Sequence, residues 1–240
     1  MIRKSIKISI LAVLLYLFVM QTKAQDTIVV RDIETWTGIS VEKKLFDKKI
    51  TVSVDQEIRN NDNSSNLNVY FTEVGVEYEF LKNFIAGFGY RFIKDKNKEN
   101  IYKNKQRYNF DLNYNTKFQR FKLYSRLRYQ RKNEFNSTDE AESKFRILLK
   151  GKYNIKDWKL DPYVSSEIFI GKIYENSFNE HSGKLDLQKM RFTLGTSYQI
   201  KNIGKLNMFY RLEHETGVFS NIYNIPVNTH IIGINYNFSL

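Results

Sequence analysis

Strict alternation of apolar and polar residues runs through most of the chain after its first 25 residues. A period of two predicts extended strands whose two faces meet different environments. In residues 69–80 the even-numbered and odd-numbered positions form two sets, and we call membership of one set the parity of a residue. The even-numbered set is mainly apolar: Tyr70, Thr72, Val74, Val76, Tyr78 and Phe80. The odd-numbered set is mainly small or acidic: Phe71, Glu73, Gly75, Glu77 and Glu79. We recognise eleven such segments: 33–43, 49–60, 69–80, 84–93, 107–114, 121–129, 144–150, 162–171, 189–200, 206–213 and 230–240.

The composition of these segments indicates a membrane barrel. Strands of about ten residues with one apolar face are typical of transmembrane barrels, and aromatic residues near the ends of that face match barrel girdles. A soluble β-sandwich also alternates, so the alternation alone does not separate the two folds. We predict an all-β fold, a single closed antiparallel transmembrane β-barrel of 10–12 strands. Since antiparallel closure needs an even number, ten and twelve are both open, and residues 26–43 are the ambiguous part.

The connections between the segments are expected to alternate in length. Short turns are expected at 81–83, 117–120, 154–157 and 202–204, and longer polar loops at 60–68, 94–105, 132–142, 172–186 and 217–228. In outer-membrane barrels short turns lie on the periplasmic side and long loops lie outside.

The first 24 residues have the pattern of a cleavable signal peptide: a basic start, an apolar stretch at 8–20 and small residues before Gln25. The apolar stretch is shorter than the roughly 20 residues that span a bilayer. We therefore expect export, a mature domain at 25–240, and location in the outer membrane of a Gram-negative-type envelope. The absence of cysteine excludes a lipoprotein anchor and disulfides.

Removal of the signal peptide reduces the basic excess. The full chain has 38 Lys and Arg; four of them lie in residues 1–24, leaving 34 against 26 Asp and Glu, a formal charge of +8. Nucleic-acid binding is not expected, because basic and aromatic residues in 122–132 lie mainly on opposite faces. Basic residues at 94–105 could meet the phosphates of lipopolysaccharide or simply be solvated, and both interpretations stay open.

The last segment, 230–240, resembles the terminal strand that outer-membrane barrels present to the barrel-insertion machinery. Its outward face carries Tyr236, Phe238 and Leu240, which we expect to form the assembly signal. The terminal residue of such strands is usually Phe, and Leu240 departs from that.

Charged residues of the inward parity are expected to form a network in the lumen. The acidic members come mainly from segments 49–60 and 69–80, and the basic members come mainly from segments within 105–152, so that an acidic wall faces or adjoins a basic one. The expected members are Asp55, Glu57, Glu73, Glu77, Glu79, Arg91, Arg107, Arg126, Arg128, Arg146, Lys150, Arg191 and Arg211. Either these charges pair and fill a narrow lumen, or they line a small pore.

Short motifs spread along the mature chain resemble an uncharacterised, domain-of-unknown-function family of outer-membrane β-barrels. They are Trp36-Thr37-Gly38-Ile39-Ser40 with Glu42-Lys43-Lys44-Leu45, Glu57-Ile58-Arg59, Thr72-Glu73-Val74-Gly75 with Tyr78, and Gly89-Tyr90-Arg91-Phe92. The resemblance implies a barrel and no particular chemistry.

An enzyme is the rival interpretation, and we do not expect one. The only histidines are His181, His214 and His230, and the adjacent His181 and Ser182 point opposite ways on an extended chain. A barrel enzyme acting on envelope lipid, built around His214 with Thr216, remains the alternative. We expect no cofactor and no metal site, since the sequence has no cysteine or histidine pair at ligand spacing. The expected function is a structural or small-pore outer-membrane barrel.

Overall fold

The computed structural model describes residues 30–47, 49–97, 99–137, 141–175, 180–201, 203–216 and 226–240, and these form strands and their connections. The predicted signal peptide lies outside the described residues, as does part of the loop at 217–228. Within the described ranges there is no helix with the length and hydropathy needed to span a membrane.

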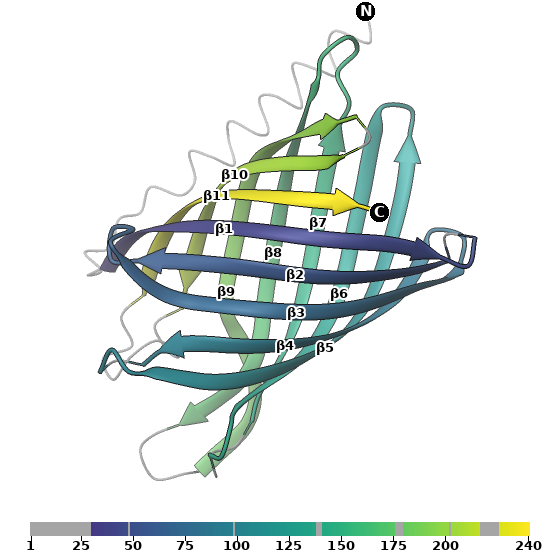
Figure 1. The fold of residues 1–240 in the computed structure, drawn as a ribbon. Coiled ribbons are helices and arrows are strands. Elements are labelled where there is room, and N and C mark those ends of the chain that lie inside the picture. The colour runs from purple at the N-terminus through teal and green to yellow at the C-terminus, as the bar shows by residue number, and fades with distance from the viewer. Residues whose placement is uncertain are drawn as a thin grey trace, which may run out of the picture.

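Eleven strands close into a barrel in which nearly every strand pairs with its neighbours in sequence (Figure 1). Each pair of consecutive strands therefore forms a hairpin, and ten such hairpins account for all of the wall except the seam between the first and last strands. The strands are β1 (Val30–Leu45), β2 (Ile50–Asn61), β3 (Asn66–Leu81), β4 (Phe84–Lys96), β5 (Tyr102–Phe118), β6 (Phe121–Glu134), β7 (Glu142–Tyr153), β8 (Leu160–Glu175), β9 (Glu180–Ile200), β10 (Gly204–Glu215) and β11 (Val227–Ser239).

The barrel closes through a parallel pair, β1 with β11, in a register that places Val41 opposite Phe238. An odd number of strands joined by hairpins leaves the first and last strands running the same way, so their pairing has to be parallel. The predicted fold, a closed all-β barrel of 10–12 strands, is confirmed. The expectation of an even number of strands with antiparallel closure is not met, because this one seam is parallel. The eleven segments read from the sequence correspond one to one with the eleven strands, and 33–43 belongs to the wall.

Each mouth of the barrel has its own set of connections. We call the mouth where β11 ends the C-terminal rim, with connections at 46–49, 82–83, 119–120, 154–159 and 201–203, and the opposite mouth the N-terminal rim. Asn83 and Gln119 adopt positive φ, as the tight two-residue turns at the C-terminal rim require.

The connections at the two rims differ less in length than the sequence predicted. β2 and β3 are separated by only four residues, 62–65, and β8 and β9 run as far as Glu175 and from Glu180. Backbone pairing continues past the apolar part of each strand because polar side chains do not interrupt a ladder of backbone hydrogen bonds. The longest connection between strands, 216–226, does lie at the N-terminal rim, as predicted.

The two faces of the wall are inverted relative to a soluble protein. On the outside, Val164 is 57% exposed and Leu194 is 60% exposed, whereas the inward Asn109 and Asn113 are 0% and 2% exposed. The apolar parity of the sequence is thus the outer surface, and the polar parity is the lumen.

A small group of apolar side chains also fills the lumen, on the side formed by β1, β8, β10 and β11. Its members are Trp36, Tyr163, Phe209 and Ile231. Gly233 faces the ring of Phe209, and Gly195 faces the ring of Tyr163, so closely that a Cβ at either glycine would overlap the ring. These glycines let large rings lie flat against the wall of a narrow barrel.

Candidate lumen site

Alternating guanidinium groups and aromatic rings follow the inner wall, one from each of seven strands. We call this set the belt; its members are Arg146 (β7), Phe169 (β8), Arg191 (β9), Trp36 (β1), Arg59 (β2), Phe71 (β3) and Arg91 (β4). All seven share the inward parity of their strands, which is why strand pairing brings them to a common surface.

Stacking within the belt is close. The guanidinium carbon of Arg59 lies 3.6 Å from the centroid of the Trp36 ring, and that of Arg91 lies 3.3 Å from the centroid of Phe71. Arg146 and Arg191 each lie 4.5 Å from the centroid of Phe169. A planar, weakly hydrated guanidinium tolerates this environment, because the ring face attracts its charge.

Carboxylates bind the edges of the guanidinium groups on the belt and beside it. Glu73 accepts hydrogen bonds from Arg91, from Arg107 at 3.1 Å and from Asn109 at 3.2 Å. Glu57 accepts from Arg59 at 2.6 Å.

Two further carboxylates, Asp111 and Glu167, bind guanidinium groups from β6 and β7. Arg128 donates to both oxygens of Asp111, at 2.6 and 2.5 Å, which is the bidentate geometry that suits a guanidinium. Glu167 accepts from Arg126 at 3.0 Å and from Arg146 at 2.8 Å. Paired charges of this kind lower the cost of burial, so the belt is a connected network and not a set of isolated ions.

A cavity of about 390 Å³ lies inside the barrel against this network. Its lining contains twelve cationic side chains and three carboxylates. The twelve are Arg59, Arg91, Arg107, Arg126, Arg128, Arg146, Arg191, Arg211, Lys132, Lys144, Lys150 and Lys189, and the three are Glu57, Glu142 and Glu167. Other carboxylates, among them Glu73, Asp111 and Glu213, neutralise part of this charge through ion pairs. The cavity surface is basic and therefore attracts anions.

The structure brings most of the predicted lumen residues together. Ten of the thirteen take part in the belt or touch it through ion pairs, ring contacts or the shared cavity; they are Glu57, Glu73, Arg91, Arg107, Arg126, Arg128, Arg146, Lys150, Arg191 and Arg211.

The remaining three predicted residues lie elsewhere. Asp55 is 3.5 Å from the hydroxyl of Ser53, Glu77 accepts from Asn113 at 3.2 Å, and Glu79 is exposed at the C-terminal rim. Lys150, by contrast, lines the shared cavity, where its Nζ atom lies 3.7 Å from the centroid of the Tyr163 ring.

Separate acidic and basic walls do not form. Arg59 and Arg91 lie among the acidic residues of β2 and β3, while Glu167 and Glu213 lie among the basic ones of β7 and β9. Interleaving is favourable, since like charges side by side in a narrow lumen would repel each other. The sequence-based list also omitted Trp36 and Phe169, together with Arg59, Phe71, Asp111, Glu167 and Glu213. Inward parity is the signal that could have identified them.

The histidine candidates do not converge. His214 Nδ1 lies 2.6 Å from Asn228 Oδ1, and His230 Nδ1 lies 2.6 Å from the hydroxyl of Tyr210. Glu213, next to His214, points into the lumen and pairs with Arg191. Thr216 donates to the backbone carbonyl of Leu187 at 2.8 Å. The side chains of His181 and Ser182 lie outside what the structure describes.

Acidic and histidine side chains form no group of three or more able to hold a metal ion, within the described ranges of the chain.

The described basic residues of 94–105, at the N-terminal rim, lie on both the inward and the outward face of the wall. Lys103 pairs with Glu134 at 3.1 Å and Lys105 pairs with Asp95 at 2.6 Å, both on the inward parity. Lys94 and Lys96 have the outward parity and lie near the rings of Tyr70 and Tyr102. Lys98 lies outside the described residues.

The model of one protein family matches residues 33–217, a range that begins in β1 and extends just beyond β10. The family is described as "Protein of unknown function (DUF2490)". No curated protein matches the chain.

Proposed function

From the premise that this chain belongs to the DUF2490 family of proteins of unknown function, we propose that it is an outer-membrane β-barrel with a structural role and a charged, largely filled lumen. Membership brings no activity with it. The proposal therefore depends on the physical properties of the barrel.

One observation carries the membrane assignment: the wall is apolar outside and charged inside. Phe110 is 53% exposed and Leu149 is 56% exposed on the outer face, while Arg146 and Glu167 are 8% and 6% exposed within the lumen. Apolar surface on this scale is unfavourable in water and favourable in hydrocarbon. A closed barrel also satisfies its backbone hydrogen bonds internally, as a bilayer requires.

The belt supports the structural role. Its rings and guanidinium groups occupy the lumen, and the carboxylates around it hold them in place. A barrel of eleven strands is narrow, and long side chains readily fill it. We propose that passage is restricted to small solutes at most.

The proposed partners follow from the apolar outer surface of the barrel and from its two rims. The outward face meets outer-membrane lipid, and Lys94 and Lys96 are placed to meet lipopolysaccharide phosphates at the N-terminal rim. Phe238 and Leu240, 37% and 77% exposed, present β11 to the barrel-insertion machinery. Export through a cleavable signal peptide completes the proposal.

Membrane fractionation with a heat-modifiability gel tests the location. We expect the protein in the outer-membrane fraction, and we expect the unheated sample to migrate differently from the boiled one, since folded barrels resist detergent. A protein recovered in the soluble fraction with no shift in mobility would contradict the assignment.

Conductance in planar bilayers tests the filled lumen. We expect no steady ion current from the wild-type protein over the usual voltage range. Large, lasting open channels would show that the belt does not fill the lumen and would favour the small-pore alternative.

A further inference from the structure

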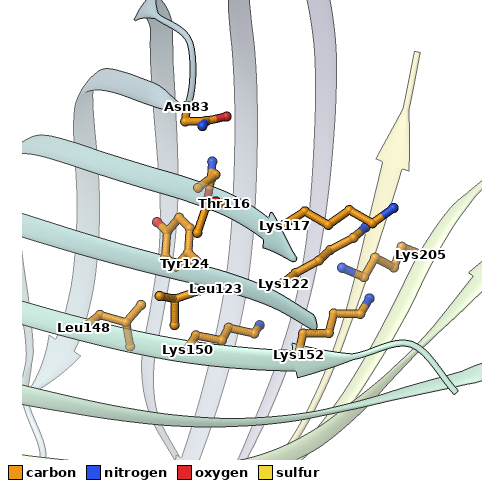
Figure 2. A pocket seen from close by; sticks show the side chains of 11 residues that line it. Asn83, Thr116, Lys117, Lys122, Leu123, Tyr124, Leu148, Lys150, Lys152 and Lys205 are labelled. Atoms are coloured by element: carbon orange, nitrogen blue, oxygen red, sulfur yellow. The ribbon is translucent and has the colours of Figure 1, made fainter. Parts of the chain in front are cut away.

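Five lysines converge at the C-terminal rim. They line a cavity of about 510 Å³ together with Asn83, Asn115, Thr116, Leu123, Tyr124 and Leu148 (Figure 2). We call this cavity the lysine vestibule; its lysines are Lys117 (β5), Lys122 (β6), Lys150 and Lys152 (β7), and Lys205 (β10). Figure 2 shows Lys117, Lys122, Lys152 and Lys205 extending toward one another.

Strand register makes this arrangement electrostatically unfavourable. Lys117 pairs directly with Lys122, and Lys122 pairs directly with Lys152, which gives three lysines in a row across three neighbouring strands. Like charges directly opposite each other destabilise a sheet. Local conflicts of this kind are expected where a binding function, and not stability, has selected the residues.

The surroundings supply little compensation. Lys152 pairs with Asp161 at 2.7 Å and donates to Ser197 at 2.7 Å. In the part of the chain that the structure describes, no ion pair involves Lys117, Lys122 or Lys205. The vestibule lining contains no carboxylate, and its remaining polar groups are amides and hydroxyls, which can bond to an anion.

The vestibule adjoins the basic cavity of the lumen. Lys150 and Leu148 line both cavities, so a single lysine lies where the two meet. From the rim to the belt, the inner surface along β6 and β7 therefore presents cations in succession: Lys122, Lys152, Lys150 and Arg146.

We propose that the lysine vestibule binds a compact, multiply charged anion of the phosphate class. Lysine ammonium groups bind phosphate oxygens as point charges. A phosphate group has more oxygens and more negative charge than a carboxylate, so it can bind several lysines at once. Lys150, Lys152 and Lys205 have the inward parity, so the barrel wall separates them from surrounding lipid. The ligand is therefore a water-soluble phosphate or phosphate ester and not a lipid headgroup. Anion binding depends on the geometry of the mouth alone; the membrane assignment enters only in the exclusion of a lipid headgroup.

Calorimetric titration of inorganic phosphate into the purified full-length protein, in a phosphate-free sugar detergent, measures the site directly. We expect saturable binding that weakens about tenfold or more in the double variant Lys122→Gln with Lys205→Gln, as for loss of charged hydrogen bonds. The matched control is Lys43→Gln with Lys49→Gln, which removes the same charge from exposed residues at the same rim. Binding that is absent, or that both double variants weaken equally, overturns the proposal.

Thermal unfolding separates a binding role from a structural one. Without phosphate, the Lys122→Gln and Lys205→Gln variant is expected to be at least as stable as the wild type, because repulsion in the lysine row is relieved. With phosphate, the wild type and the control variant should gain more stability than the vestibule variant, through ligand linkage. A loss of stability in the vestibule variant without phosphate would assign these lysines to folding and overturn the proposal.

The source of the phosphate group is tested with two probes in parallel. We expect glycerol 3-phosphate to compete with inorganic phosphate, and phosphatidylglycerol vesicles to leave the titration unchanged. A response to the vesicles alone would overturn the water-soluble ligand. Because location is measured separately by fractionation, failure of this site and failure of the membrane assignment are distinguishable.

Discussion

Arg59 stacks on Trp36 across the β1 and β2 pair, with its guanidinium carbon 3.6 Å from the ring centroid. The two residues are direct partners in the register, so the backbone itself sets their approach. The Nε atom of the same guanidinium donates to Glu57 at 2.6 Å. One side chain thus joins an aromatic ring to a carboxylate, which is the pattern repeated around the belt.

Replacing Trp36 by alanine should destabilise the barrel. The ring is 4% exposed and contacts Arg59, Arg191 and Arg211, so its removal leaves a cavity and takes one ring contact from each of three guanidinium groups. We expect a loss of about 3 kcal/mol in the free energy of unfolding, measured by urea titration in detergent. Trp36→Phe is the control and should retain most of the stability; equal losses in the two variants would mean that stacking contributes nothing.

Glu167→Gln should be more harmful than its small change in size suggests. Its carboxylate binds Arg126 and Arg146 and lies 3.6 Å from Arg191, so the amide would leave three cations in the lumen poorly compensated. We expect about 3 kcal/mol of destabilisation, the range typical for breaking a buried ion pair. The same substitution at the exposed Glu99 should have almost no effect. Equal heat-modifiability temperatures for the two variants would argue against a connected network.

Gly233→Ala should impair folding through one identified clash. The added Cβ would overlap the ring of Phe209, which lies flat against β11 in the lumen. We expect a reduced yield of folded, heat-modifiable protein. A second substitution, Phe209→Leu, should restore much of that yield by removing the ring, and failure of this rescue would point to a backbone effect of the alanine.

A charge on the outer face tests the membrane assignment quantitatively. Leu194 is 60% exposed and lies near the middle of the ladder that joins β9 to β10. It should therefore lie within the hydrocarbon. Leu194→Arg is expected to reduce stability in lipid vesicles by about 2–4 kcal/mol, and Ile203→Arg, in the turn at the C-terminal rim, by about 0–1 kcal/mol. The same cost at both positions would contradict a bilayer around the wall.

Deleting Phe238 to Leu240 should block assembly. Phe238 pairs with Val41 and Ser239 with Glu42, and the amide of Leu240 donates to the carbonyl of Glu42 at 2.9 Å, so the deletion removes the end of the parallel seam. We expect the truncated chain to accumulate in the periplasm, detected by cell fractionation, while Phe238→Leu inserts normally. Normal insertion of the truncated chain would remove these residues from the assembly signal.

Strand identity and the face of each residue were predictable because alternation is a local property. The apolar parity of Val74, Phe88 and Leu194 became the outer surface, and the polar parity of Glu73, Arg91 and Arg146 became the lumen. Strand ends were less predictable, since pairing extends beyond the apolar part of each strand, as in β8 and β9.

The sequence by itself determined eleven alternating strands, an apolar exterior and a set of inward charges, because a period of two assigns each side chain to a face wherever the chain is extended. Only the tertiary structure decided that β1 and β11 pair in parallel, that Trp36 and Phe169 lie between arginines, and that Lys117, Lys122 and Lys152 form one row. Those relationships depend on register and closure, which join residues far apart in the chain and leave no periodic trace in any one segment.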